Sequence, residues 1–177
     1  MKLNENPSPK NLKELKRLYR SAFPISEKKP FGLMLKKQAE GTMKLMTVED
    51  EKGAFLGLVI TIHHKDIVLL DYFAVSPAFR GKGIGSEVLS LLKNQYSGKR
   101  ILLEIEDPEE PCKNREERLR RKDFYLRNGL SVQDYKVWLF GVKMLILTNK
   151  TTISFEEYHE IFKVVFSEKT AKHVILA

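Results

Sequence analysis

The sequence predicts a mixed α/β domain built around one twisted sheet. Segments with the 3.6-residue apolar period of a helix alternate with short apolar runs typical of buried strands. No linker, repeat or low-complexity segment interrupts this alternation. With 177 residues, of which 42% are hydrophobic, the chain is long enough for one full core, so we expect a single domain over residues 1–177.

The first two predicted elements are helices. Ser8 and Pro9 have the residue types of an N-cap and a first helical position, and Pro24 ends the amphipathic segment that follows. A shorter helix, FGLMLKKQAEG, begins at Phe31 and ends at Gly41, a common residue just past a helix C-terminus.

Residues 43–77 predict three strands. Turn-forming residues at 51–53 and 64–66 separate them, so we expect sequential antiparallel hairpins. The third strand, IVLLDYFAV, is apolar on both faces apart from Asp71, which is typical of a central strand covered on both sides.

The rest of the chain continues the alternation. The pattern predicts, in order, a helix with Ile84 and Leu92 turned inward, a buried strand (99–107), a helix (117–127) stopped by Asn128 and Gly129, two strands (131–148) bent at Gly141, and a helix (155–166) opened by a Ser154–Glu157 capping box.

The charge balance favours an anionic partner, but its distribution is that of an ordinary solvated surface. Lys and Arg number 31 against 23 Asp and Glu, a net charge of +8, yet basic residues mostly stand beside acids, as in KNREERLRRKD. A nucleic-acid partner is therefore disfavoured.

No apolar run approaches the roughly 20 residues of a membrane span, and the start is too polar for a signal peptide, so we expect a cytoplasmic protein with no membrane partner. Cys112 has no second cysteine to pair with and lies in a charged stretch without histidine, which favours an incidental surface thiol over a nucleophile.

Residues 80–86, here called the glycine corner, join the third strand to the helix after it. The surrounding sequence, SPAFRGKGIGSEVL, lacks the G-x-x-x-x-G-K-[ST] spacing of a P-loop and the G-x-G-x-x-G spacing of a dinucleotide fingerprint. Glycines at 81, 83 and 85 permit positive φ and a close approach of a ligand, and a helix that starts near Gly83 offers unpaired N–H groups.

These features predict an anion site. The amides of Gly81 to Ser86 would hold a phosphate or pyrophosphate, with Arg80 and Lys82 adding positive charge. The alternative is a tight turn without a ligand, for which three alternating glycines flanked by two cations are more than is needed.

The same stretch resembles a known family signature. The run V-S-P-A-F-R-G-K-G-I-G is similar to the acetyl-CoA-binding motif R/Q-x-x-G-x-G/A of the GCN5-related N-acetyltransferases (GNAT), and F-Y-L-R-N-G-L at 124–130 resembles that family's F-Y-x-x-x-G-F segment. The element order fits over about 8–148. The resemblance implies a GNAT-like domain with a twisted, mostly antiparallel sheet, helices on both faces, a splayed central strand pair and a C-terminal helical extension at about 151–177.

The resemblance also implies acetyl-CoA as the acyl-donor substrate, with no metal. The amides of Arg80 to Gly85 would hold the pyrophosphate, the pantetheine arm would lie along residues 71–75, and the amide of Phe73 or its neighbour would polarise the thioester carbonyl. The implied cofactor-binding residues are Phe73, Val75, Arg80, Gly81, Lys82, Gly83, Ile84, Gly85 and Ser86.

For catalysis the resemblance places Tyr125 in the position of the general acid. The first candidate for the base is Glu104, which matches the acid of the family's L-E-V strand pattern, here LEI. Glu106 shares its strand face by period two, and Asp71, an ionisable group inside an apolar strand, is a further candidate. These acids could instead bind the substrate's ammonium or pair with arginines, and a water path could replace a dedicated base.

Two regions depart from the family or lie at the acceptor side. The 107–118 connection is longer than usual and is expected to be an exposed loop, and Arg118 stands where the family often has an asparagine. This weakens the assignment of the family's cofactor contact to Asn114 and leaves Arg118 or Arg121 as alternatives for contacting the cofactor arm.

The weak candidates for lining an acceptor pocket are Tyr19, Phe23 and Phe31. His63 and His64 point to opposite strand faces and cannot chelate one metal ion.

The sequence thus predicts an acetyl-CoA-dependent N-acetyltransferase, which moves the acetyl group to a primary amine of a small molecule or peptide through a ternary complex. The alternatives are a non-catalytic acyl-CoA-binding or regulatory module and a basic nucleic-acid-associated protein. The protein could be a monomer or a homodimer.

Overall fold

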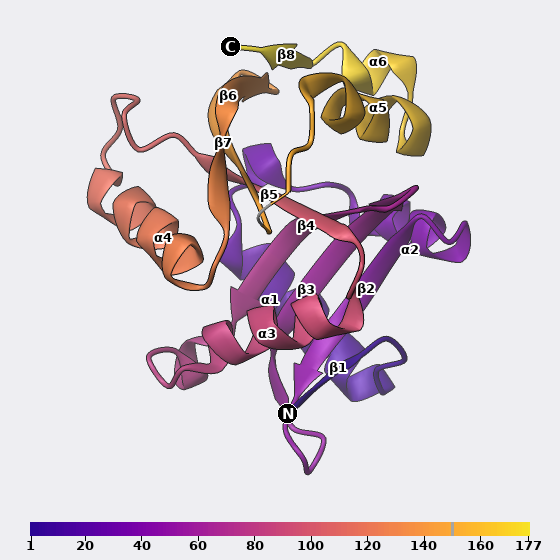
Figure 1. The fold of residues 1–177 in the computed structure, drawn as a ribbon. Coiled ribbons are helices and arrows are strands. Elements are labelled where there is room, and N and C mark those ends of the chain that lie inside the picture. Colours follow the sequence, from indigo (N-terminus) through magenta and orange to yellow (C-terminus); the bar gives the residue numbers. More distant parts are fainter. Residues whose placement is uncertain (150) are drawn as a thin grey trace. The chain divides into compact units, whose positions relative to one another are not determined.

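The computed structural model describes residues 1–149 and 151–177 (Figure 1), and these residues form two compact units. The first unit contains Met1–His63 and Leu70–Ser97, and the second contains His64–Leu69 and Gly98–Ala177. Each unit is therefore built from two separate stretches of the chain. The single domain expected from chain length stays a prediction.

Strand pairing confirms the predicted mixed α/β class and the mostly antiparallel sheet. The strands pair in the order β1-β2-β3-β4-β5-β7-β6-β8, and β4 with β5 is the parallel pair. The strands are β1 (Lys2–Asn4), β2 (Met43–Glu49), β3 (Phe55–His64), β4 (Ile67–Val75), β5 (Arg100–Glu106), β6 (Ser131–Leu139), β7 (Val142–Thr148) and β8 (Val174–Leu176). The helices are α1 (Pro9–Ala22), α2 (Phe31–Ala39), α3 (Ile84–Gln95), α4 (Arg115–Arg127), α5 (Phe155–Val165) and α6 (Glu168–Ala171), with 3-10 turns at Ile25–Glu27 and Pro77–Phe79. Across the described residues, every helix is too short or too polar to span a bilayer.

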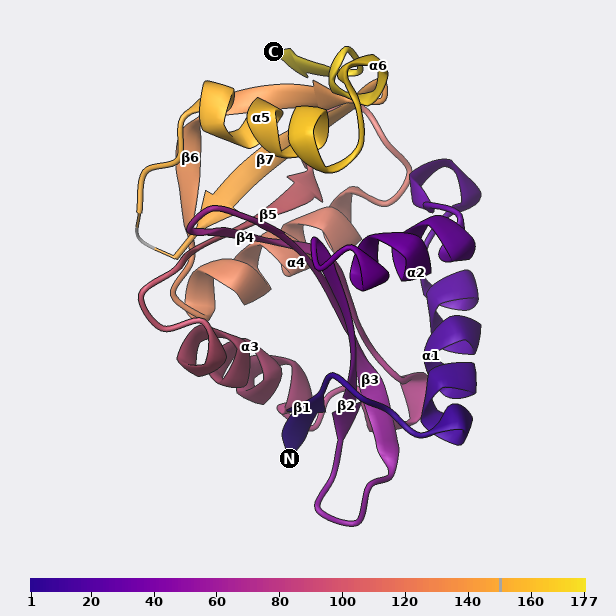
Figure 2. The same cartoon turned by 90° about the vertical axis from the view of Figure 1, so that its right-hand side faces the viewer.

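In the first unit, helices cover both faces of the paired strands β2 and β3. Figure 2 shows α1 and α3 on opposite sides of these strands. Helix α1 begins as its sequence predicts, because the Ser8 hydroxyl accepts a hydrogen bond from the Asn11 amide at 3.2 Å and Pro9 is the first helical residue. The buried side of α1 contributes Leu15, Leu18 and Tyr19 to the core.

In the second unit, α4 and α5 lie on opposite sides of the β6–β7 hairpin (Figure 1). The hairpin turns at Phe140 and Gly141, both with positive φ, as tight hairpins require. The predicted capping box is confirmed: Ser154 Oγ accepts from the Glu157 amide at 3.3 Å, and Glu157 Oε2 accepts from the Ser154 amide at 3.0 Å. Helix α4 begins two residues before the predicted position.

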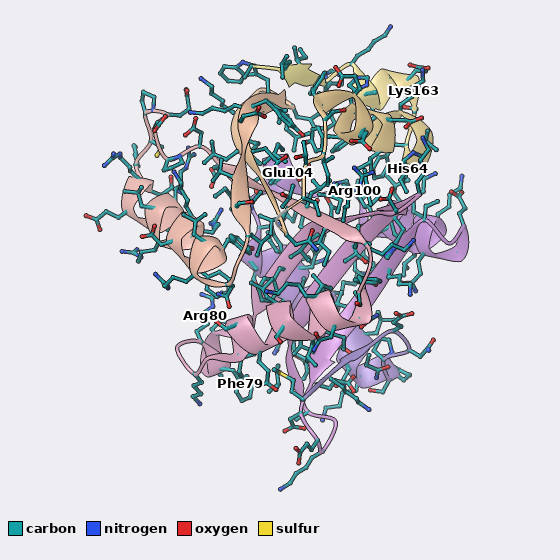
Figure 3. The ribbon with its side chains drawn as sticks, viewed as in Figure 1. His64, Phe79, Arg80, Arg100, Glu104 and Lys163 are labelled. Carbon is teal, nitrogen blue, oxygen red and sulfur yellow. The ribbon has the colours of Figure 1, made fainter. Side chains whose placement is uncertain are left out.

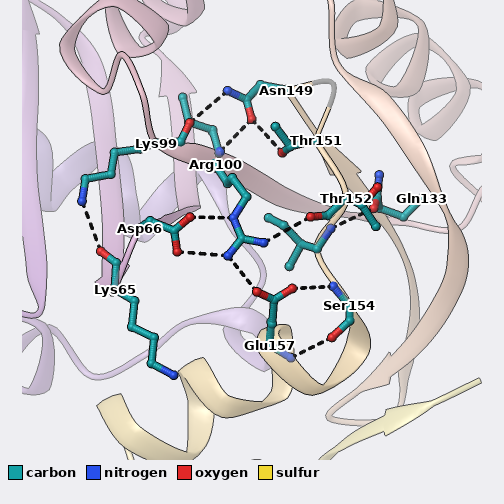
Figure 4. A network of polar contacts seen from close by, with 12 residues as sticks. Lys65, Asp66, Lys99, Arg100, Gln133, Asn149, Thr151, Thr152, Ser154 and Glu157 are labelled. Carbon is teal, nitrogen blue, oxygen red and sulfur yellow. Dashed lines mark hydrogen bonds and ion pairs between the residues drawn. The ribbon is translucent and has the colours of Figure 1, made fainter.

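An arginine fixes the start of β5 within the second unit (Figure 4). The Arg100 guanidinium donates to both oxygens of Asp66, at 2.7 and 3.0 Å, to Glu157 at 2.7 Å and to the Thr152 carbonyl at 3.2 Å. The bidentate pair with Asp66 is the strongest of the common ion-pair geometries. Arg100 therefore joins the β3–β4 turn, strand β5 and the first turn of α5.

Candidate functional site

The glycine corner has the backbone that its sequence predicts at two of its three glycines. Gly81 and Gly83 have φ of +74° and +78°, a region that glycine enters at little cost. Gly85 does not share it, because it already lies in the first turn of α3. A Cβ on Gly81 or Gly83 would meet no heavy atom within 4 Å, so the space beside both residues is open.

Five successive amides of the corner point to a binding function. The amides of residues 81–85 have no hydrogen-bond acceptor within the described part of the chain. The predicted row is shorter by one residue at each end: the Arg80 amide donates to Pro77 at 3.4 Å, and the Ser86 amide donates to Gly83 at 3.1 Å. N–H groups without a partner at the start of a 12-residue helix, together with the positive end of its dipole, favour an anion, so this row stays the candidate anion site.

The two cations of the corner have local contacts. Arg80 is exposed, and its Nε donates to the Val75 carbonyl at 3.1 Å. Lys82 is also exposed, and its Nζ lies 5.5 Å from the centre of the Phe79 ring (Figure 3 labels Phe79 and Arg80). Both contacts are with residues of the same segment, so the two positive charges stay local to the corner.

Strand β4 presents Phe73 and Val75 at the edge of the first unit's strands. Within that unit, the strand order ends at β4, and β3 is its strand neighbour. Gly57 of β3 makes this pairing possible, because a Cβ there would lie 2.5 Å from the Ala74 carbonyl oxygen. The sequence analysis did not single out Gly57, although a glycine inside a strand often marks a close backbone approach.

Asp71 of β4 lies in a cluster that includes the residues predicted to line an acceptor pocket. Its Oδ1 accepts from Lys29 Nζ at 2.7 Å. Tyr19, Phe23, Phe31 and Tyr72, here called the aromatic cluster, are linked by ring contacts of 4.9 to 6.1 Å between centroids. Burial is the largest cause of the raised pKa of Tyr19, and the Tyr72 hydroxyl and Asp71 raise it further. This phenol therefore stays neutral over the whole physiological range.

Tyr125 lies in the second unit, on the buried side of α4. Its side chain is 8% exposed and packs edge-on against Phe124. Burial raises the pKa of Tyr125 to about 12, opposed in part by the charge of Arg121. A phenol with this pKa is protonated at neutral pH and can donate a proton, but it is a weaker acid than a solvated tyrosine.

The two acids of β5 are both hydrogen-bonded, and their partners come from different helices. Glu104 Oε1 accepts from the Tyr158 hydroxyl of α5 at 2.7 Å. Glu106 accepts from Arg118 at 2.6 Å and from Arg121 at 3.2 Å, both on α4. Period-two alternation puts the two acids on one strand face, but Glu106 ends β5, where long arginine side chains can reach it.

The expectation that residues 107–118 form an exposed loop is correct only in part. Asp107 is 1% exposed and accepts from Lys136 at 2.8 Å, and α4 already begins at Arg115. Arg118, considered for the cofactor arm, is 12% exposed and bound to Glu106 and to the Asp107 carbonyl. Cys112 is half-buried.

The family model described as "Acetyltransferase (GNAT) domain" matches residues 42–130, about half of the chain. The chain belongs to the GNAT acetyltransferase family. The matched range includes both the glycine corner and the 124–130 segment on which the resemblance was based. No curated protein matches the sequence significantly.

Solved structures of GNAT proteins have the same fold. A protein from Bacteroides thetaiotaomicron described as a GNAT-family acetyltransferase superposes with a TM-score of 0.77 at 20% identity, over 94% of this chain and 98% of that one. Spermidine N-acetyltransferase from Vibrio cholerae in complex with CoA and spermine gives 0.62 at 15% identity, over 80% of this chain and 90% of that one. At these identities the likeness establishes the fold alone.

The structure divides the predicted GNAT site residues between the two units. The first unit contains all the cofactor-binding candidates, from Phe73 to Ser86, together with Asp71. The second contains Tyr125, Glu104 and Glu106. His63 and His64 contact different partners. The His63 ring is hydrogen-bonded to the Thr61 hydroxyl at 2.8 Å and packs edge-on against Tyr96, both in the first unit. His64 Nε2 lies 3.4 Å from Glu160 in the second unit.

Proposed function

We propose that this GNAT protein is an N-acetyltransferase that moves the acetyl group of acetyl-CoA directly to a primary amine in a ternary complex. One observation carries the proposal: the amides of residues 81–85 form an open row at a helix N-terminus, without an acceptor among the described residues, and β4 belongs to the same unit. A diphosphate and an extended amide-bearing arm are the two parts of CoA that such a surface suits.

Different cofactor-binding residues would bind different parts of CoA. The amides of Gly81 to Gly85 would bind the pyrophosphate, with Arg80 and Lys82 neutralising charge and Ser86 completing the first turn of α3. The backbone of Phe73 and Val75 at the edge of β4 would pair with the pantetheine amides, as a strand added to a sheet edge does. An amide aimed at the thioester oxygen would stabilise the negative charge that develops there.

The reaction breaks the thioester C–S bond and forms an amide C–N bond. The amine nitrogen loses one proton, and the CoA sulfur gains one. Tyr125 is our candidate donor to the sulfur, supported by the neutral phenol that its burial maintains. Glu104 remains the first candidate base, with Tyr158 as the group that would orient its carboxylate. The complex of the Vibrio cholerae enzyme with CoA and spermine supports an amine as acceptor.

A thermal-shift titration with acetyl-CoA, CoA and ATP tests the cofactor, and a panel of amines with thiol release as readout tests the transfer. We expect stabilisation by acetyl-CoA at a far lower concentration than by ATP, because ATP lacks the arm that pairs with β4. We also expect thiol release with at least one primary amine. Equal responses to acetyl-CoA and ATP would contradict the cofactor assignment, and a shift without thiol release from any amine would indicate a binding module.

A further inference from the structure

Asp71 has a buried oxygen that the protein leaves unused. The side chain is 4% exposed, and one oxygen is taken by Lys29. The other, Oδ2, is buried and has no hydrogen-bond partner among the described residues. A carboxylate can accept about four hydrogen bonds, so Asp71 retains capacity for a donor with several N–H groups.

Lys29 Nζ lies across the edge of β4. It lies 2.7 Å from Asp71 Oδ1 and 5.1 Å from the centre of the Tyr72 ring. Asp71 and Tyr72 are adjacent in the strand, so their side chains point to opposite faces. One ammonium can meet both only near an edge of the strand.

The backbone of Lys29 is fixed, whereas its side chain has a path to solvent. The Lys29 amide donates to the Tyr72 hydroxyl at 3.1 Å, and its carbonyl accepts from the Tyr19 hydroxyl at 2.9 Å. The side chain is 22% exposed. Its ammonium can therefore leave Asp71 by rotation about side-chain bonds, without unfolding the segment that carries it.

The aromatic cluster provides apolar walls and disfavours a second positive charge. Tyr19 and Tyr72 are 2% and 5% exposed, and Phe23 packs edge-on against Tyr72 at 4.9 Å. Lys16 Nζ lies 5.2 Å from the centre of the Phe31 ring, so one face of the cluster already has a cation. A ligand with one ammonium and a hydrocarbon body matches these surroundings better than a polycation does.

We infer that Asp71 binds the ammonium of the acceptor and that Lys29 is an internal stand-in for it, which the acceptor displaces. The inference rests on the proposed function. The Lys29 side chain is itself a butylammonium, so its departure leaves room for an alkylamine of that size next to Asp71. Lys29 thereby competes with the acceptor: the apparent affinity for every amine is the intrinsic affinity multiplied by the fraction of time that Asp71 is free of Lys29. The favoured acceptors are primary monoamines with an apolar body. Their single ammonium must first give one proton to the candidate base, Glu104, before its nitrogen attacks the thioester.

Steady-state kinetics of Lys29→Ala with n-butylamine and 1,4-diaminobutane test the inference, since the two probes have the same length and differ in charge. We expect Lys29→Ala to lower the KM for n-butylamine by about tenfold with kcat within about twofold. Lys28→Ala removes the neighbouring charge, which donates to the Arg20 carbonyl, and serves as the matched control with an unchanged KM. The wild-type protein should have the lower KM for n-butylamine of the two probes. An unchanged or raised KM in Lys29→Ala would overturn the inference and leave the acetyltransferase proposal intact.

Direct binding separates this inference from the proposed function. We expect n-butylammonium to raise the melting temperature of Lys29→Ala, and Asp71→Asn in the same background to abolish that shift. This readout needs no turnover, so it decides the inference even if no amine is acetylated. Absence of the shift in correctly folded Lys29→Ala would show that the Lys29–Asp71 pair only holds the α1–α2 connection on β4.

Discussion

The glycine corner of the first unit and the end of β5 in the second unit are both rich in polar groups, but they differ in how many of these groups are hydrogen-bonded within the protein. In the corner, the amides of residues 81–85 have no acceptor in the described chain, and nearby in the sequence Asp71 Oδ2 is buried without a donor. At the end of β5, Glu104, Glu106 and Asp107 all accept hydrogen bonds from other elements of their unit. Buried polar groups are normally paired, so the Asp71 oxygen calls for a functional explanation. Residues 81–83 are exposed, so a ligand could reach their amides.

Asp107 shows how firmly the acids that follow β5 are paired. Burial alone would raise its pKa, but the hydrogen bonds from Lys136 and from the Glu109 amide outweigh burial and hold that pKa below its usual range. Lys136 also binds Glu109, and Lys143 binds Glu110 at 3.1 Å. The insertion after β5 is thus held by ion pairs to the β6–β7 hairpin, a structural role. The difference indicates that charge and a perturbed pKa alone do not identify a ligand site, because ion pairs within the fold produce both.

Gly83→Val is the substitution with the largest expected effect, and it tests whether the amides of the glycine corner bind a ligand. A side chain at φ +78° would tilt the row of amides and block the open space beside it, so at least two charge-assisted hydrogen bonds to phosphate should be lost. We expect the Kd for acetyl-CoA, measured by calorimetry, to rise by about 1,000-fold. Gly53→Val is the matched control, with the same φ and equally open surroundings in the β2–β3 turn. Comparable loss of binding in both variants would show that backbone strain, not the phosphate site, is responsible.

Tyr125→Phe tests whether the second unit contributes chemistry as well as structure. If the phenol protonates the CoA sulfur, kcat should fall by about 100-fold, while the Kd for acetyl-CoA stays within about twofold. Tyr135→Phe is the control in the same unit, because the Tyr135 hydroxyl is buried with no hydrogen-bond partner among the described residues and burial likewise raises its pKa. Turnover by Tyr125→Phe equal to that of the wild type with a good acceptor would remove the acid role.

Tyr158→Phe has the smallest expected effect of the three changes. It measures how much the hydrogen bond from Tyr158 to Glu104 contributes to stability. Tyr158 is fully buried, and its hydroxyl donates to a carboxylate, so its loss should lower the free energy of unfolding by about 2 kcal/mol. For Tyr135→Phe we expect a neutral or slightly stabilising effect on the free energy of unfolding, because the Tyr135 hydroxyl makes no hydrogen bond within the described chain. Urea denaturation of the two variants provides the measurement. Equal stability of both would mean that the Glu104 hydrogen bond contributes nothing to folding.

Local sequence signals determined most of the elements and the most specific part of the site. The Ser8 and Ser154 caps, the two-residue turns and the positive φ of Gly81 and Gly83 depend on residues close together in the chain, so their patterns could be recognised there. The short elements β1, β8 and α6 went unpredicted, because three or four residues carry no periodicity and form only where a neighbour pairs with or packs on them.

The tertiary structure alone decided which polar residues have partners. In the sequence, Glu104, Glu106 and Asp71 carry the same local signal, since each is an acid inside an apolar strand, and only the family resemblance ranks Glu104 first. Their partners, Tyr158, Arg118 and Lys29, are 54, 12 and 42 residues away along the chain. Hydrogen bonding acts over about 3 Å in space and carries no signal along a sequence. The sequence therefore determined the row of amides that offers an anion site, and only folding revealed the occupied acids of β5 and the Lys29–Asp71 pair at the edge of β4.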